Sequence, residues 1–388
     1  MPRYILPIIV ISQFFCTSLW FAGNGVINDL AIEFSLQSNA LGHLTSAVQL
    51  GFIVGTLVFA ILSIADRYYP SRVFLFSALL GACFNLGIIV EGNTLLSLLI
   101  LRFFTGFFLA GIYPVGMKIA ADYYEKGLGK ALGFLVGALV VGTAFPHLLK
   151  EITQAYPWRY VVVATSVMAV IGGLLMVILV PNGPFRKSSQ TTDVLAFFMV
   201  FKNRKFRSFA YGYFGHMWEL YVFWAFVPII IRKYMSEHPQ SLLNVPILSF
   251  IIIAIGGLAC ILSGYLAQKI GNQRTAFLAL FLSCGCCLIS PWILSTQYEY
   301  LFIGFLVFWG IVVVADSPLL STLVAQNATP EIKGTALTIV NCLGFTISII
   351  SIQLVSGMLG WTNSNGIYAV LAIGPIMGLM ALRRKINY

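Results

Sequence analysis

Twelve apolar runs dominate the sequence, and each is long enough to cross a lipid bilayer as a helix. About 20 predominantly apolar residues span the hydrocarbon core. The runs cover residues 4–28, 41–65, 73–91, 95–121, 131–150, 158–180, 208–232, 244–267, 275–296, 299–325, 334–358 and 366–382. Only 9% of the residues are charged, against about 25% in soluble domains. We therefore expect an all-α membrane protein with twelve transmembrane helices, and we exclude a soluble enzyme, a disordered protein and a disulfide scaffold.

Lysine and arginine are unevenly divided between the two sides that this topology defines. If the termini and the central loop share one side, 17 of the 23 basic residues lie there and 4 lie on the other, while Arg102 and Lys118 fall within a span. Cytoplasmic loops carry the excess of positive charge. The pattern predicts cytoplasmic termini in a bacterial cytoplasmic (inner) membrane. The net charge of +10 is thus a topology signal, and we expect no nucleic-acid partner.

The halves on either side of the central loop resemble one another. Arg67 and Lys269 are separated by 202 residues, and so are Arg72 and Arg274. Gly106 aligns with Gly310, and Pro114 with Pro318, at an offset of 204. Two parallel six-helix halves form one known transporter architecture. We predict an N-terminal bundle over 1–181, a cytoplasmic central loop over 182–207 and a C-terminal bundle over 208–388.

Two loops and one span carry a family resemblance. The run Gly-Tyr-Leu-Ala-Gln-Lys-Ile-Gly-Asn-Gln-Arg over 264–274 resembles the loop signature of the major facilitator superfamily, and the first loop keeps Ala65, Asp66, Arg67 and Arg72 of it. Arg102 with Gly106 resembles the R-x-x-x-G motif of that superfamily's fourth span. The resemblance covers the whole chain and implies two pseudo-symmetric six-helix bundles.

The resemblance also implies a conformational latch at the two loops. The positive-inside rule explains the basic residues of these loops equally well, whereas a latch is the better explanation for Asp66. The expected latch residues are Asp66, Arg67, Arg72, Gln268, Lys269 and Arg274.

Charged residues inside spans identify the candidate site, because each is costly in the bilayer and usually faces a partner or a water-filled path. His216 and Glu219 are three residues apart in the seventh span and share a helix face. Desolvation favours the neutral form of both, so both are candidate proton carriers, with Asp316 as the second carboxyl candidate. The structural alternatives are an ion pair between Glu219 and Arg102 or Lys118, and a packing histidine. The resemblance makes Arg102 a proton-coupling partner or an anion contact.

Spans 1, 4, 7 and 10 line the central cavity in the superfamily, so the resemblance assigns further residues to a cavity wall. They are Asn24, Tyr113, Trp218 and Tyr221. Lys118 lies near the end of its span, and we expect it to extend to the membrane interface.

These features predict a secondary active transporter that moves a small organic molecule or ion by alternating access, coupled to protons. No phosphate-binding G-x-x-x-x-G-K-S/T motif occurs, so ATP is not the expected energy source. The alternatives are a small-anion uptake symporter or uniporter, a metal-ion exporter and a transport-incompetent membrane receptor. We expect no enzymatic activity, catalytic residue, cofactor or resident metal. The expected partners are a small-molecule substrate, protons and the lipid bilayer, and the expected state is a monomer.

Overall fold

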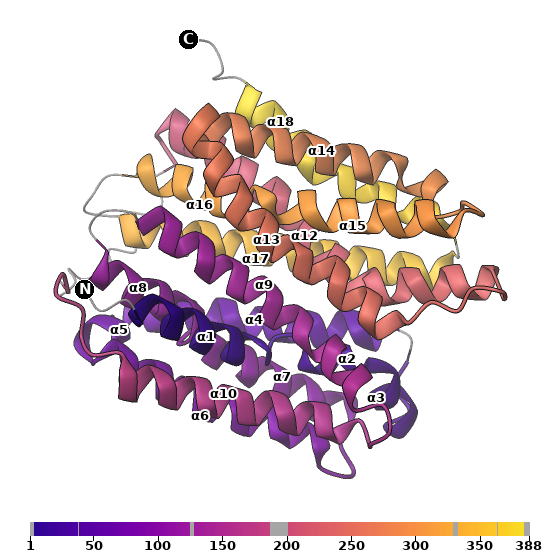
Figure 1. Cartoon of the computed structure of the whole chain (residues 1–388), viewed down its shortest axis with the longest axis horizontal. Coiled ribbons are helices and arrows are strands. Elements are labelled where there is room, and N and C mark those ends of the chain that lie inside the picture. Colours follow the sequence, from indigo (N-terminus) through magenta and orange to yellow (C-terminus); the bar gives the residue numbers. More distant parts are fainter. Residues whose placement is uncertain are drawn as a thin grey trace. The chain divides into compact units, whose positions relative to one another are not determined.

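Helices make up all the regular structure that the computed structural model describes (Figure 1). The described residues are 4–37, 39–124, 128–186, 201–328, 333–362 and 364–383. Most of the predicted central loop, over 187–200, lies outside them. The chain divides into two compact units, Met1–Val194 and Leu195–Tyr388.

Unit 1 contains the first six spans. α4 packs against α7, α6 against α10, and α1 against both α9 and α10. The helices are α1 (Ile5–Thr17), α2 (Ala22–Gly25), α3 (Ile27–Glu33), α4 (Ala40–Ile61), α5 (Ile64–Arg67), α6 (Pro70–Leu86), η1 (Gly87–Ile89), α7 (Leu95–Leu109), α8 (Tyr113–Tyr123), α9 (Leu128–Ile152) and α10 (Arg159–Leu179).

Unit 2 contains the other six. α12 packs against α17 and α18, and α13 packs against α15. The helices are α12 (Arg204–Glu237), α13 (Val245–Ile270), α14 (Asn272–Ile293), α15 (Glu299–Ala315), α16 (Ser317–Gln326), α17 (Lys333–Trp361), η3 (Asn365–Ala372) and α18 (Ile373–Arg383).

Eleven described segments are long and apolar enough to cross a membrane, and the helix Ile5–Thr17 is a shorter apolar one. Large apolar side chains such as Phe76, Ile178 and Leu262 are exposed, whereas small polar ones such as Ser249 and Ser283 are buried. Exposure of so many apolar side chains is expected where lipid, and not water, surrounds the helices. The chain is an integral membrane protein.

Three of the predicted spans are interrupted. The first predicted span is broken at a turn over 18–21, between α1 and α2, which is why its helix is short. The fourth breaks between α7 and α8, and the tenth breaks at Asp316, between α15 and α16. Pro114 and Pro318 each lie in the first turn of the helix that follows. Proline has no N–H to donate and clashes with the preceding turn, so a break is expected there.

Local sequence signals explain where several helices begin and end. The Thr94 side chain and the Ser97 side chain form a reciprocal capping box at the start of α7. The Asn203 carboxamide oxygen accepts from the backbone amides of Lys205 and Phe206 and so caps α12. Gly271 closes α13 at φ +90°, a conformation that glycine adopts at little cost.

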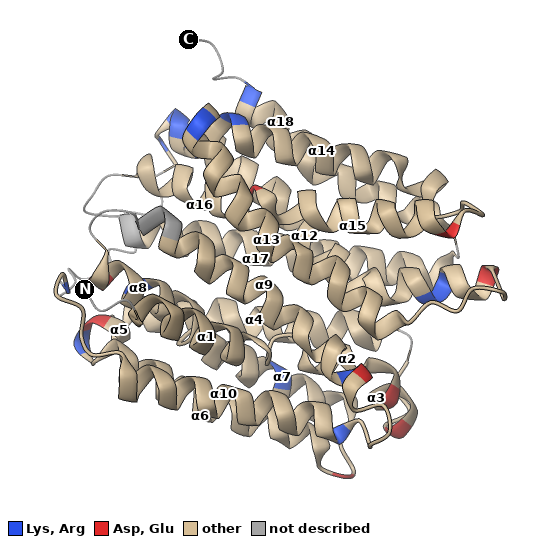
Figure 2. Ribbon diagram, viewed as in Figure 1, with Lys and Arg blue, Asp and Glu red and all other residues tan. Residues whose placement is uncertain are grey.

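Charged residues occupy few positions along the helices, and most are near helix ends (Figure 2). Of the charged side chains within spans, Arg102, Glu219 and Asp316 are each 1% exposed. A charge withdrawn from water needs a partner or a proton. These three residues are therefore the first candidates for a functional site.

Candidate functional site

The helix α12 brings two titratable side chains into the interior of unit 2. His216 and Glu219 lie three residues apart, and each is 1% exposed. Buried side chains surround them along the helix, from Phe206 to Tyr234. The predicted juxtaposition of these two residues on α12 is present in the structure.

His216 contacts Asp316, the residue at which the tenth span breaks. The His216 Nδ1 lies 2.7 Å from the Asp316 Oδ1, and both side chains are 1% exposed. The ring N–H is not aligned with the oxygen as in a hydrogen bond. Two unprotonated acceptors would repel at this distance. At least one proton on the two groups therefore accounts for the separation, and the contact joins α12 to the residue that precedes α16.

Glu219 has a different environment, supplied by α14 and α15. The Ser283 hydroxyl donates a hydrogen bond to the Glu219 Oε1. The Trp309 indole N–H donates to the same oxygen at 2.6 Å. These two donors from two helices hold the carboxyl group in one orientation. α12 thus contacts two buried carboxyl groups about one helical turn apart, its own Glu219 and, through His216, Asp316. Neither Ser283 nor Trp309 was predicted from the sequence, because a serine and a tryptophan in apolar runs carry no distinctive pattern.

Arg102, on α7 in unit 1, is held by the interrupted first span. Its Nη1 donates to the Leu19 carbonyl at 3.1 Å and to the Asn85 Oδ1 at 3.2 Å, and its Nη2 donates to the Trp20 carbonyl. The turn over 18–21 exposes the carbonyls that these bonds use. Arg102 therefore fixes the break between α1 and α2.

Further hydrogen bonds orient Asn85. Its amide group donates to the hydroxyls of Thr165 and Ser166, at 3.2 and 2.9 Å, and to the Val162 carbonyl at 3.2 Å. With its amide nitrogen engaged by α10, Asn85 presents its oxygen to Arg102. Asn85 was not predicted from the sequence, although a polar side chain within an apolar span usually indicates a buried polar partner.

Lys118 forms ion pairs near the end of its span, and its extension to the membrane interface stays a prediction. Its Nζ lies 2.9 Å from the Asp66 carboxylate and 3.6 Å from that of Asp122. The Arg186 guanidinium donates to the backbone carbonyls of Asp66 and Tyr68, at 3.1 and 3.0 Å. Asp66 is thus engaged through both its side chain and its backbone, and it is tied to the fourth span and to the segment after α10.

The other predicted latch residues show no such ion pairs. Within their own units, and as far as the structure describes them, Arg67, Arg72, Lys269 and Arg274 lie in no ion pair with a carboxylate. The Gln268 side chain is exposed. Their role as a latch stays a prediction.

The predicted wall residues occupy mixed environments. Asn24 is buried and donates to the Thr45 hydroxyl at 2.9 Å, and Tyr113 is half-buried at the start of α8. Trp218 is half-buried, and its indole N–H donates to the Val370 carbonyl at 3.2 Å. The Tyr221 ring lies 5.4 Å from that of Trp224 and 5.2 Å from that of Phe345.

The comparisons with known proteins agree with this architecture. The chain is 28% identical over 277 residues to the multidrug resistance protein MdtG of Proteus mirabilis, a match that covers 70% of this chain and 67% of the relative. A crystal structure of a mutant of the nucleoside transporter NupG superposes with a TM-score of 0.75 at 13% identity, over 99% of this chain and 100% of the other. A bacterial homolog to the human lysosomal transporter Spinster superposes with a TM-score of 0.68 at 15% identity, over 98% and 92%.

A family model covers most of the sequence. The model described as Major Facilitator Superfamily matches residues 9–353. This match spans both units and includes His216, Glu219 and Asp316 as well as Arg102. The chain belongs to the major facilitator superfamily of transporters and is not an enzyme.

Proposed function

We propose that this chain is a proton-coupled secondary active transporter that moves a small organic molecule across the cytoplasmic membrane by alternating access. The observation that carries the proposal is the His216–Asp316 contact, 2.7 Å long and 1% exposed on both sides. A histidine is the side chain whose charge changes most readily near neutral pH. A buried carboxylate that loses its partner is destabilised, so the contact links the packing of α12 to the protonation of this pair.

The second acidic site supports coupling between protonation and helix movement. Glu219 connects α12 to α14 and α15, whereas His216 connects α12 to the break of the tenth span. Addition or removal of a proton at either site changes the forces that hold these helices together. A gradient of protons can therefore bias the position of α12 relative to its neighbours.

The charge distribution supports the proposed topology. With 17 basic residues on the side of the termini and 4 on the other, the positive-inside rule supports cytoplasmic termini. We propose that the N-terminal bundle (1–181) and the C-terminal bundle (208–388) rock about a central site, and that a monomer suffices for transport. Release of the Asp66–Lys118 ion pair would accompany one half of the cycle.

The names of the relatives suggest which class of substrate to test. Their names describe a multidrug resistance protein and a nucleoside transporter, so small organic molecules are the first class to test. A second candidate, uptake of an organic anion, is favoured by one observation: Arg102 is buried without a carboxylate partner in the described part of unit 1.

Purified protein in vesicles with an imposed pH gradient and an internal pH dye tests the proposal. The probes are tetraphenylphosphonium, uridine and benzoate, which represent an organic cation, a neutral nucleoside and an organic anion. We expect at least one probe to accumulate and to change the internal pH, and Glu219→Gln to abolish both effects. If wild-type vesicles accumulate none of the three and show no proton movement, the proposal is wrong.

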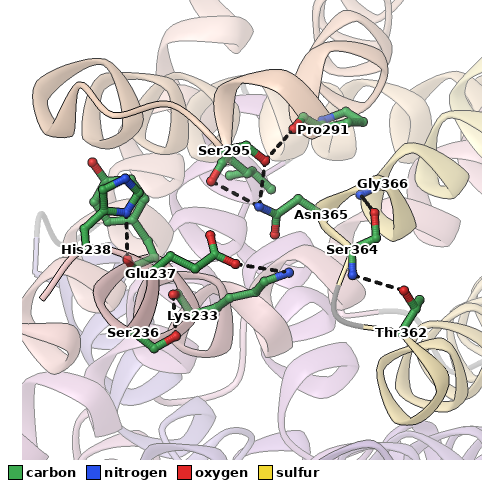
Figure 3. A network of polar contacts seen from close by, with 12 residues as sticks. Lys233, Ser236, Glu237, His238, Pro291, Ser295, Thr362, Ser364, Asn365 and Gly366 are labelled. Atoms are coloured by element: carbon green, nitrogen blue, oxygen red, sulfur yellow. Dashed lines mark hydrogen bonds and ion pairs between the residues drawn. The ribbon is translucent and has the colours of Figure 1, made fainter.

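The same helix offers a matched control. Glu237 lies at the end of α12, where its side chain is 41% exposed and 3.8 Å from the Lys233 Nζ (Figure 3). Glu237→Gln removes an acid from α12 without touching the buried sites. We expect this variant to transport like the wild type, so a loss of transport confined to Glu219→Gln identifies the buried carboxyl group.

A further inference from the structure

Arg102 is a buried cation whose partners, among the residues that the structure describes, are all neutral. Its side chain is 1% exposed, and its three hydrogen bonds go to the Leu19 and Trp20 carbonyls and to the Asn85 amide oxygen. None of the ion pairs in the described part of unit 1 includes it. Carbonyl dipoles offset part of the desolvation cost of a guanidinium, but a buried charge is normally paired with an opposite one.

Three other basic residues of unit 1 have a carboxylate nearby, although they are more exposed. Lys118 pairs with Asp66 at 2.9 Å, Lys150 pairs with Asp29 at 2.8 Å, and Arg159 pairs with Glu33. Among the residues that the structure describes, unit 1 therefore provides countercharge near the ends of its helices, while its most buried cation has none.

The guanidinium also has hydrogen-bonding capacity to spare. It carries five N–H donors, of which three are used, and Nε has no hydrogen-bond partner among the described residues. Beside Nε lies Gly23. A Cβ at this glycine would be 3.5 Å from Nε and 3.8 Å from Cζ, with no atom nearer. The missing side chain leaves a space about the size of a methyl group against the unused edge of the guanidinium.

We propose that Arg102 binds the carboxylate of a small organic anion, with Nε–H as one donor and the space beside Gly23 as the place of the oxygen. A carboxylate supplies the missing charge, and its planar pair of oxygens suits the guanidinium fork. A neutral ligand would use the free donor but would leave the charge uncompensated. The inference rests on the proposed transport function, because alternating access must open this buried position, and it specifies the substrate class.

The surroundings hold Arg102 ready for such a ligand. Asn85 is oriented by Thr165 and Ser166, and the two carbonyls belong to the fixed turn between α1 and α2. A binding group whose supporting hydrogen bonds are already made loses little freedom when the ligand arrives.

The test is the unfolding temperature of the purified full chain in lipid nanodiscs, titrated with sodium benzoate and with sodium acetate. Sodium chloride and sodium sulfate at the same ionic strength serve as references. We expect a saturable rise with the two carboxylates beyond that with chloride or sulfate. Gly23→Ala keeps Arg102 but covers Nε with a methyl group at ordinary contact distance, so we expect it to weaken the apparent affinity at least about tenfold.

Two further variants keep the test decisive. Gly264→Ala is the matched control, because a Cβ there meets nothing within 4 Å, and it should respond like the wild type. Arg102→Lys retains the charge but not the fork, and we expect it to lose the response; if it fails to fold, Gly23→Ala decides. Absence of a carboxylate response in the wild type overturns the proposal, as does an undiminished response in Gly23→Ala or a response to sulfate of the same size.

The two proposals can fail independently. Carboxylate binding that depends on Gly23, without accumulation of any probe in vesicles, would retain the anion site and reject transport. Accumulation of tetraphenylphosphonium or uridine, without a carboxylate response in nanodiscs, would retain transport and reject the anion site.

Discussion

Gly106 lies so close to the backbone carbonyl of Val48 that a Cβ at this glycine would overlap the carbonyl oxygen. Unit 2 contains the equivalent contact, in which a Cβ at Gly310 would overlap the Ile252 carbonyl oxygen. Gly310 follows Gly106 by 204 residues, and Ile252 follows Val48 by the same number. The internal repeat therefore includes the packing of the fourth span on the second and of the tenth on the eighth. Glycine permits such close approach between membrane helices.

Alanine at either glycine should be strongly destabilising. We expect Gly106→Ala and Gly310→Ala to lower the free energy of unfolding by about 1–3 kcal/mol or more, because the new methyl group meets rigid backbone. The measurement is thermal unfolding in nanodiscs. Gly285→Ala, where a Cβ meets nothing within 4 Å, is the control and should be close to neutral. Equal stability of all three variants would contradict the contact.

The His216–Asp316 pair should behave as an energetic unit. His216→Gln or Asp316→Asn alone should cost about 3–5 kcal/mol, since each leaves a buried group without its partner. The double variant should cost less than the sum, with a coupling of about 1–3 kcal/mol. Denaturant titration of the wild type, both single variants and the double variant gives this coupling. Strictly additive losses would show that the two side chains do not interact.

The Asp66–Lys118 ion pair should control the rate of the transport cycle. Asp66→Asn removes the charge that faces Lys118 at 2.9 Å, while the backbone of residue 66 keeps its bond from Arg186. We expect slower turnover with little change in substrate affinity, measured from initial rates over a range of concentrations of the accumulated probe. Asp29→Asn, which removes the partner of Lys150, is the comparison. Unchanged turnover in Asp66→Asn would argue against a latch.

The Ser283 hydroxyl should stabilise unit 2 through Glu219. Ser283→Ala removes a hydrogen bond to the buried carboxyl group and should cost about 1–3 kcal/mol, the range for a buried group that loses its hydrogen-bond partner. Ser290 is buried on the same helix and donates to the Cys287 carbonyl at 2.8 Å, an uncharged backbone acceptor. Ser290→Ala should therefore cost less. Comparison of the two unfolding temperatures decides whether Glu219 depends on this bond.

Much of the fold could be predicted from the sequence, because the bilayer imposes a simple rule on chain composition. The apolar runs identify the spans, and the paired offsets of Gly106 with Gly310 and of Pro114 with Pro318 identify the repeat. The spacing of His216 and Glu219 also predicts that both share a face. These features depend on periodicity and length, which are local properties of the chain.

The partners of the buried charges could not be predicted in the same way. Arg102 is bound largely by backbone carbonyls at a helix break, and every residue has a carbonyl, so residue types give no signal. The contact of His216 with Asp316 joins residues that are 100 positions apart in the sequence. Whether the two side chains lie at the same depth in the membrane depends on where the tenth span breaks, at Asp316. The ion pair of Lys118 with Asp66 likewise joins two different helices, whose separation the sequence does not encode.

The proline of the tenth span changes which donors reach one backbone carbonyl. Pro318 cannot donate to the carbonyl four residues earlier, at Val314. That oxygen accepts instead from the Asp316 backbone amide and from the Cys260 thiol, 3.5 Å away on α13. Because a thiol is a weak donor, this contact adds a yielding link between α13 and the junction of α15 with α16.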